Sequence, residues 1–122
     1  TEPSIWDCFV RHLHRLGCTM PEAALHRDPA AATVADEAVQ AQLIAVYKLF
    51  PYSAQLCELL VDLDEGMQEW RYRHVKMVER TIGAKLGTGG SAGMAYLRET
   101  LFKPLFPDLW AIRPQLSGRG RS

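Results

Sequence analysis

The stretch SAQLCELLVDLDEGMQEWRYRHVKMVERTI, residues 53–82, gives the strongest indication of the fold. Its apolar residues are spaced alternately by four and three positions, at Leu56, Leu60, Leu63, Met67 and Trp70, and the pattern resumes at Met77. That spacing brings side chains onto one face of an α-helix. The sequence therefore predicts a single long helix of about 45 Å, packed along its length.

Shorter helices are expected before this stretch. Ser4 is placed to cap the first helix, with Asp7 in the capping-box position and Gly17 at the end. The apolar face expected for this helix consists of Ile5, Phe9, Leu13 and Leu16. A short second helix is expected at about 21–26, where proline and glutamate suit the first turn. Asp36 precedes a third helix, whose apolar side is Val39, Leu43, Val46, Tyr47 and Phe50.

After the long helix the sequence predicts a glycine-rich turn at 87–93, a last helix over about 93–102, and irregular backbone from Pro104 onward. No convincing alternating strand pattern is present, so the predicted fold class is all-α. We expect residues 1–116 to belong to one domain and residues 117–122 to form a mobile tail.

Composition narrows the class of protein. Hydrophobic residues make up 48% of the chain, which excludes a wholly disordered protein. No apolar run approaches the roughly 18 residues of a membrane span, and the first residues do not resemble a signal peptide. The three cysteines, Cys8, Cys18 and Cys57, are unclustered. This pattern favours reduced thiols in a cytoplasmic protein.

Charge is unevenly distributed although the formal net charge is zero. Residues 1–68 contain ten acids and four bases, whereas residues 69–122 contain four acids and ten bases. The second part includes a basic cluster of Arg71, Arg73, Lys76, Arg80 and Lys85. Such a cluster suits nucleic acid, a carboxylate ligand or the propionates of a cofactor, but a solvated helix face is an equal alternative.

His74 is the first candidate for chemistry, because it lies on the apolar seam between Trp70 and Met77. A buried imidazole needs a partner, which is either a backbone carbonyl in a protein core or an iron ion. No Cys-x-x-Cys-His motif is present, so any haem would be held without covalent attachment. His12 and His14 are interpreted as helix-surface residues.

The glycine-rich turn is the second candidate. It allows close backbone approach, and Thr88 adds a hydroxyl suited to a carboxylate or an ammonium group. Gly87, Gly89 and Ala92 formally fit the dinucleotide-binding pattern, with Asp108 beyond them. That interpretation is rejected, because the pattern must follow a strand and here follows a helix. A flexible connection between helices remains the alternative.

A long ordered set of motifs resembles the signature of tryptophan 2,3-dioxygenases. The motifs are LLVDLD at 59–64, WRYRHV at 70–75, GTGGSAG at 87–93, YLR at 96–98 and FPDLW at 106–110. The distance from His74 to Thr88 also matches. The resemblance covers roughly residues 6–113.

This resemblance implies an all-α enzyme that binds haem b and opens the indole ring of L-tryptophan with O2, giving N-formylkynurenine. It implies that His74 is the proximal ligand of the haem iron and that Thr88 contacts the backbone end of the substrate. It also implies a cytoplasmic homotetramer, with neither nucleic acid nor membrane as a partner.

The chain departs from the family in one respect. The family's amino-terminal half, with the distal-pocket motifs and the arginine that pairs with the substrate carboxylate, has no counterpart here. We therefore expect the missing half or another subunit to complete the site. Two alternatives stay open. One is a related haem enzyme that oxygenates an indole in biosynthesis, and the other is a non-catalytic helical binding module that uses the basic half.

Overall fold

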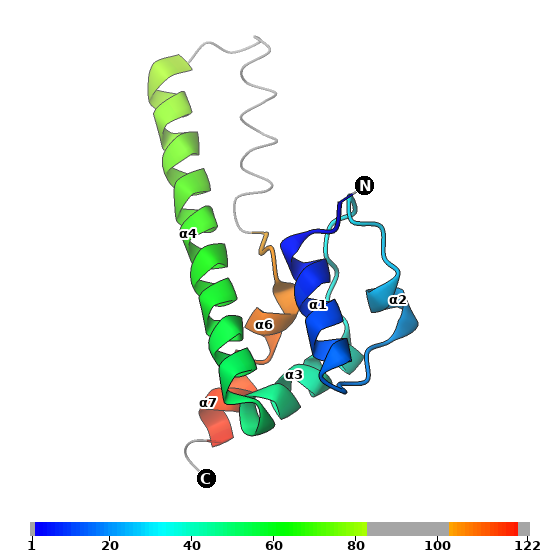
Figure 1. Ribbon diagram of the computed structural model, residues 1–122. Helices are drawn as coiled ribbons and strands as arrows, with labels where there is room; N and C mark the ends of the chain where they lie inside the picture. The colour runs from blue at the N-terminus through cyan, green and yellow to red at the C-terminus, as the bar shows by residue number, and fades with distance from the viewer. Residues whose placement is uncertain (1, 83–102, 120–122) are drawn as a thin grey trace. The chain divides into compact units, whose positions relative to one another are not determined.

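The computed structural model describes residues 2–82 and 103–119, and every regular element within them is a helix (Figure 1). The all-α fold expected from the sequence is therefore confirmed. The elements are α1 (Ile5–Arg15), α2 (Glu22–Leu25), α3 (Glu37–Leu49), α4 (Pro51–Ile82), α6 (Pro107–Ala111) and α7 (Arg113–Arg119). The glycine-rich turn and the helix expected at 93–102 lie outside the described residues.

The chain divides into two compact units. Unit 1 combines Thr1–Val61 with Leu105–Ser122, so it is assembled from both ends of the sequence. Unit 2 is Asp62–Pro104, and its described part consists mainly of the second half of α4. The long helix was predicted correctly, since Gly66 in its interior does not interrupt it. No helix among the described residues combines the length and the apolar character needed to cross a membrane.

Helix α1 begins and ends as the sequence predicts. The Ser4 hydroxyl accepts a hydrogen bond from the Asp7 amide at 3.1 Å, and Asp7 accepts one from the Ser4 amide at 3.0 Å, which completes a capping box. Gly17 then ends the helical region with a φ of 103°. This left-handed backbone conformation is the one that glycine adopts at lowest cost.

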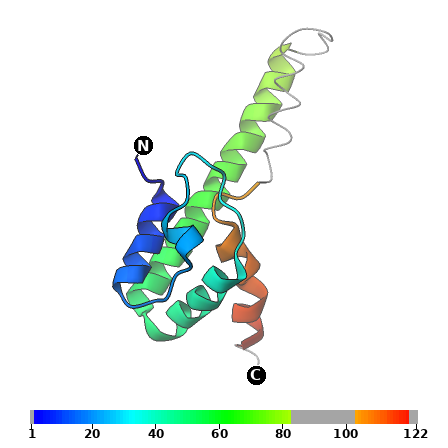
Figure 2. The same ribbon diagram turned by 90° about the vertical axis from the view of Figure 1, so that its right-hand side faces the viewer.

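The buried face of α1 differs from the prediction. Trp6 and Val10 are buried along with Phe9 and Leu13, whereas Ile5 is 57% exposed and Leu16 41% exposed. The reason is tertiary: Phe106, directly before α6, stacks on Trp6 with 5.6 Å between ring centroids. Figure 2 shows α6, in orange, beside α3, and both helices belong to the unit that contains α1. Such a long-range contact rotates the buried face, and the sequence of one helix does not reveal it.

Helix α3 follows the prediction closely. The Asp36 side chain caps it by accepting from the amide of Ala38 at 2.8 Å. Its expected apolar side supplies three fully buried residues, Val39, Leu43 and Val46, and two that are partly buried, Tyr47 and Phe50. Pro51 then begins α4, a position in which the missing amide hydrogen of proline costs nothing.

Irregular backbone was expected after Pro104, and this expectation is wrong for residues 107–111 and 113–119. Pro107 begins α6 and Pro114 lies in the first turn of α7. Both prolines were assigned to irregular backbone, but in the first turn of a helix proline is favourable. Helix α7 continues to Arg119 and so includes residues 117–119. The mobility expected for residues 117–122 stays a prediction, and the last three residues lie outside the described part.

A charged cluster joins three helices of unit 1. The Tyr47 hydroxyl of α3 and the Arg113 guanidinium of α7 both donate hydrogen bonds to the Glu58 carboxylate of α4. The hydrogen bond from Arg113 is the main reason why the pKa of Glu58 lies below its ordinary value. Next to this cluster, complete burial raises the pKa of the Cys57 thiol to about 12, which keeps it neutral.

Candidate functional site

Helix α4 carries two different faces in unit 2. Asp64 and Val75 are buried, whereas Leu63, Met67, Trp70 and Met77 are between 36% and 58% exposed. With 3.6 residues per turn, the two sets lie roughly a third of a turn apart. The apolar seam predicted to be packed is thus open in this chain. We call the four exposed residues, Leu63, Met67, Trp70 and Met77, together with the partly buried His74 between them, the apolar face of α4.

His74 lies on this apolar face and stacks against Trp70. The two ring centroids are 5.0 Å apart and the planes are nearly parallel, at 4°. Residues four positions apart on a helix are neighbours, so the stack follows directly from the sequence spacing. The contact holds the imidazole ring flat against the indole and limits its rotation.

The imidazole nitrogens of His74 have no hydrogen-bond partner among the described residues. His74 is partly buried, and no backbone carbonyl of that part of the chain accepts from it. The interpretation of a core histidine satisfied by a carbonyl therefore finds no support. The geometry leaves a ring nitrogen available to a ligand or a metal ion.

The remaining histidines lie in unit 1 and differ from His74. His26 pairs with Glu22 at 3.1 Å on the exposed side of α2. His12, expected on the surface, is only partly exposed, and its Nε2 lies 3.5 Å from the Ser53 hydroxyl. His14 is exposed, as expected. None of the described residues forms a group of three or more His, Cys, Asp or Glu suited to hold a metal ion.

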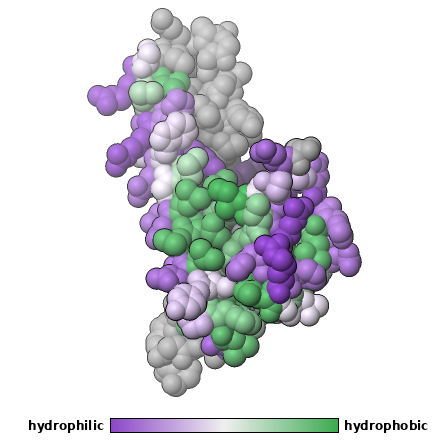
Figure 3. Space-filling view, viewed as in Figure 1, coloured by the Kyte–Doolittle hydropathy of each residue, from purple (hydrophilic) through white to green (hydrophobic). Residues whose placement is uncertain are grey.

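The exposed bases lie on another side of α4, which we call the basic flank and define by Arg73, Lys76 and Arg80. Helical spacing puts it about a third of a turn from the apolar face. Figure 3 shows hydrophilic side chains along the outer edge of the helix. Lys76 pairs with Glu79 at 3.6 Å and lies 5.8 Å from the centre of the Tyr72 ring.

A surface groove of about 410 Å³ is lined by the basic flank together with Tyr72, Met77 and Thr81. A second groove, of about 440 Å³, is lined by Glu65, Gln68, Glu69, Tyr72 and Arg73, so only one of its residues belongs to the basic flank. Neither groove includes His74. Arg71, in contrast, donates a hydrogen bond to the carbonyl of Lys103 at 2.8 Å. Arg71 is therefore separate from the basic flank, and Lys85 of the predicted cluster lies outside the described residues. The second candidate, Thr88, lies outside the described residues.

Comparison with known proteins gives a consistent result. The family model described as tryptophan 2,3-dioxygenase matches residues 4–116. A tryptophan 2,3-dioxygenase of Herpetosiphon aurantiacus is 58% identical over 115 residues, which cover 94% of this chain and 44% of the relative. One from Anaeromyxobacter dehalogenans is 57% identical over 114 residues, with 93% and 43% covered. The chain spans less than half the length of these curated relatives.

Proposed function

The chain belongs to the tryptophan 2,3-dioxygenase family, and on that premise we propose that it forms the iron-ligating part of an enzyme that opens the indole ring of L-tryptophan. The reaction joins both atoms of O2 to the substrate and gives N-formylkynurenine, so it needs no external reductant in each turnover. Because the chain spans less than half of its relatives, the proposal assigns it one part of the active site.

The main support for this function is the environment of the His74 imidazole. Its ring nitrogens have no partner among the described residues, and exposed apolar side chains surround it on α4. A neutral imidazole on an apolar surface suits the proximal side of haem b, a flat and largely apolar ligand. The donor set therefore fits a single axial ligand, whereas a metal ion held by several side chains is not supported in the described part.

When bound, the haem iron supplies the activation of O2. This chain's residues have other tasks. His74 would supply a nitrogen ligand to the iron, Trp70 would fix the orientation of the imidazole plane, and Met67 and Met77 would exclude water from the surroundings. The basic flank lies on a different side of α4 from His74. We therefore do not expect its residues to contact the haem propionates.

The proposal gives Thr88 the role that the family resemblance implies, contact with the backbone end of the substrate. It also includes a cytoplasmic homotetramer, in which the remainder of the family polypeptide covers the apolar face of α4. The 36–58% exposure of Leu63, Met67, Trp70 and Met77 supports a covering partner.

The decisive experiment replaces His74 in the intact polypeptide and restores the ligand chemically. We expect His74→Gly to lose the axial-ligand signature in the haem absorption and resonance Raman spectra, and added imidazole to restore it. His14→Gly, on the exposed side of α1, is the control and should leave both spectra unchanged. If His74→Gly keeps its axial ligand without imidazole, another residue ligates the iron and the assignment is wrong.

The reaction itself is tested with the unaltered intact polypeptide, haem, O2 and L-tryptophan. We expect the absorbance of N-formylkynurenine to appear. A normal haem spectrum together with an oxygenated indole whose ring is intact would instead identify a biosynthetic relative. Purified protein that takes up no haem would identify a binding module.

A further inference from the structure

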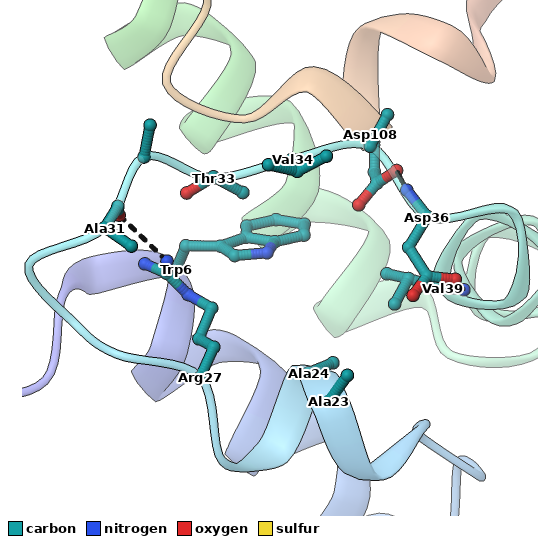
Figure 4. A pocket seen from close by; sticks show the side chains of 12 residues that line it. Trp6, Ala23, Ala24, Arg27, Ala31, Thr33, Val34, Asp36, Val39 and Asp108 are labelled. Atoms are coloured by element: carbon teal, nitrogen blue, oxygen red, sulfur yellow. Dashed lines mark hydrogen bonds between the residues drawn. The ribbon is translucent and has the colours of Figure 1, made fainter.

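A cavity of about 220 Å³ lies in unit 1, far along the sequence from His74. It is lined by Trp6 of α1, by α2 and the loop that follows it, by the start of α3 and by Asp108 of α6, and it is partly open to solvent (Figure 4). Most of its wall is small and apolar, from Ala23, Ala24, Val34 and Val39. Five side chains with polar groups also line it: Trp6, Arg27, Thr33, Asp36 and Asp108. A cavity lined by apolar side chains alone would be an ordinary gap in the packing. The polar groups therefore determine which ligand the cavity can bind.

Asp108 places a carboxylate oxygen on the cavity wall. The residue is only 1% exposed, and its Oδ1 accepts from the Asp36 amide at 2.8 Å and from Gln40 Nε2 at 3.0 Å. Its other oxygen receives no hydrogen bond from the described residues. Figure 4 shows that one oxygen is turned toward Asp36 and the other toward the space beside Trp6. No buried side-chain oxygen of the described residues lacks a partner, so this oxygen is reached by solvent in the cavity, where the donor of a ligand can replace water.

Trp6 contributes a donor to the same space. Its side chain is 96% buried, since only 4% is exposed, yet its indole N–H has no acceptor among the described residues. In Figure 4 the indole lies in the middle of the lining residues, with its nitrogen on the edge nearer Ala23 and Ala24. Since no buried side-chain nitrogen of the described residues lacks a partner, this N–H is reached by solvent in the cavity. The cavity therefore presents both an unused acceptor and an unused donor.

Arg27 does not offer a free cation to a ligand. Its Nε and Nη2 donate to Asp7 and Ser4, and its Nη1 donates to the carbonyls of Asp28 and Ala31. These bonds use all five N–H groups of a guanidinium. Asp7 also balances its charge. The remaining charged groups that line the cavity are the carboxylates of Asp108 and Asp36. Their negative charge disfavours binding of an anion.

We propose that this cavity is a binding site for a small organic ammonium compound that also carries a neutral hydrogen-bond acceptor. The ammonium group donates to the free oxygen of Asp108, the acceptor oxygen receives the indole N–H of Trp6, and the carbon chain lies against the alanine and valine side chains. At about 30 Å³ per water molecule, the volume admits a ligand of about six or seven non-hydrogen atoms. Aminobutanol has this size and both functional groups.

The test is a calorimetric titration of the intact protein with aminobutanol, compared with butanediol and hydroxybutyrate. We expect measurable binding of the amine and much weaker binding of the neutral and anionic probes. Asp108→Asn should weaken amine binding roughly ten- to a hundredfold, because a charged hydrogen bond is lost. Trp6→Phe removes only a neutral donor and should weaken it roughly threefold to tenfold.

Two further variants serve as a negative control and as an independent test of the cavity. Glu37→Gln removes an exposed acid near the start of α3 that does not line the cavity, and it should leave amine binding unchanged. Ala24→Leu fills the cavity without touching Asp108, so it decides the question if Asp108→Asn does not fold. Equal binding of the amine and the diol would overturn the proposal, and so would full binding of the amine to the Ala24→Leu variant. If none of the probes binds, the cavity holds only water and the proposal is also wrong.

Discussion

A single aromatic contact determines how His74 is presented. With 4° between the planes and 5.0 Å between the centroids, the imidazole rests against Trp70 rather than turning freely. Aromatic pairs of this kind contribute about 0.5–1.5 kcal/mol beyond their buried area. Because Trp70 is 58% exposed, that energy orients the histidine and adds little to the stability of the fold.

For Trp70→Ala we expect a change in cofactor binding without a change in folding. Loss of the stack should speed haem dissociation from the intact protein by up to roughly tenfold, in proportion to about 1 kcal/mol. The free energy of unfolding of the unloaded chain should change by less than about 0.5 kcal/mol. Haem transfer to apomyoglobin and urea denaturation measure the two quantities. Trp70→Phe should restore most of the retention; a large loss of stability would show that Trp70 belongs to the core instead.

The ion pair of Asp7 and Arg27 stabilises the folded protein. Burial of Asp7 favours its neutral form, but hydrogen bonds from Ser4 and Arg27 outweigh burial and lower the pKa of the carboxyl below 3.8. A carboxyl whose pKa is lowered by folding stabilises the protein at pH values above its unfolded pKa. That stabilisation is lost as the pH falls through the lowered folded-state pKa.

Asp7→Asn should therefore destabilise the protein by about 1.5–3 kcal/mol at neutral pH, the range for hydrogen bonds to a charged group. Below the folded-state pKa of Asp7 the variant and the parent should converge. Urea unfolding followed from neutral pH to strongly acidic pH measures both effects. A difference that stays constant across this range would mean that the charge of Asp7 is not the cause.

At the scale of elements, two glycines allow a matched comparison. Gly17 has a φ of 103° in the turn after α1, whereas Gly66 lies inside α4. A Cβ atom built on either residue meets nothing within 4 Å. Any difference between the two alanine variants therefore comes from the backbone and not from steric contact.

We expect Gly17→Ala to destabilise the protein by about 1–2 kcal/mol, the cost of a left-handed conformation for an L-residue. Gly66→Ala should instead stabilise it by about 0.5–1 kcal/mol, because alanine favours helix. Thermal and urea denaturation of both variants test the opposite signs. A stabilised Gly17→Ala variant would show that the turn adopts another conformation in solution.

The elements that the sequence predicted are those with local signals. The cap at Ser4, the stop at Gly17, the cap at Asp36 and the length of α4 depend on neighbouring residues alone. Helices α6 and α7 were missed, because proline signals both the start and the end of a helix.

The surroundings of His74 were also predictable only where they depend on neighbouring residues. The spacing on α4 placed His74 beside Trp70, but the openness of that face depends on what covers the helix. The free oxygen of Asp108 was beyond sequence reasoning, because its hydrogen-bond partner Asp36 lies 72 residues away in the chain.

At the scale of the whole molecule, the apolar face of α4 must be explained. Soluble proteins seldom leave a contiguous row of large apolar side chains open. The matched relatives are more than twice as long as this chain. We therefore expect that the remaining part of the polypeptide, or another subunit, packs against Leu63 and Met67.

The double variant Leu63→Glu, Met67→Glu tests this expectation. In the intact polypeptide we expect loss of assembly and of bound haem, measured by light scattering and by absorption. In the 122-residue chain alone the same change should alter the free energy of unfolding by less than about 0.5 kcal/mol, because both side chains are exposed. Ile5→Glu, at an exposed position of α1, is the control. A fully assembled and haem-loaded double variant would contradict a covering role for this face.

The 122-residue chain alone is expected to be inactive. A haem pocket needs walls on both faces of the ring, and the described residues offer one candidate ligand, His74. Supplied with haem, reductant, O2 and L-tryptophan, it should give no N-formylkynurenine above the background of free haem. A monomeric and fully active product would show that the site is complete without a partner.

The discontinuous composition of unit 1 has a consequence for biosynthesis. Its core joins Trp6 to Phe106, and its third helix is held at the start by Asp108. A ribosome must therefore translate all of residues 62–104 before the segment that closes this core is made. Until then the nascent chain exposes the surface that Phe106, Leu109 and Ile112 later bury. Closure across so long a separation is slow, so chaperone binding during translation is expected to concentrate on the first 61 residues.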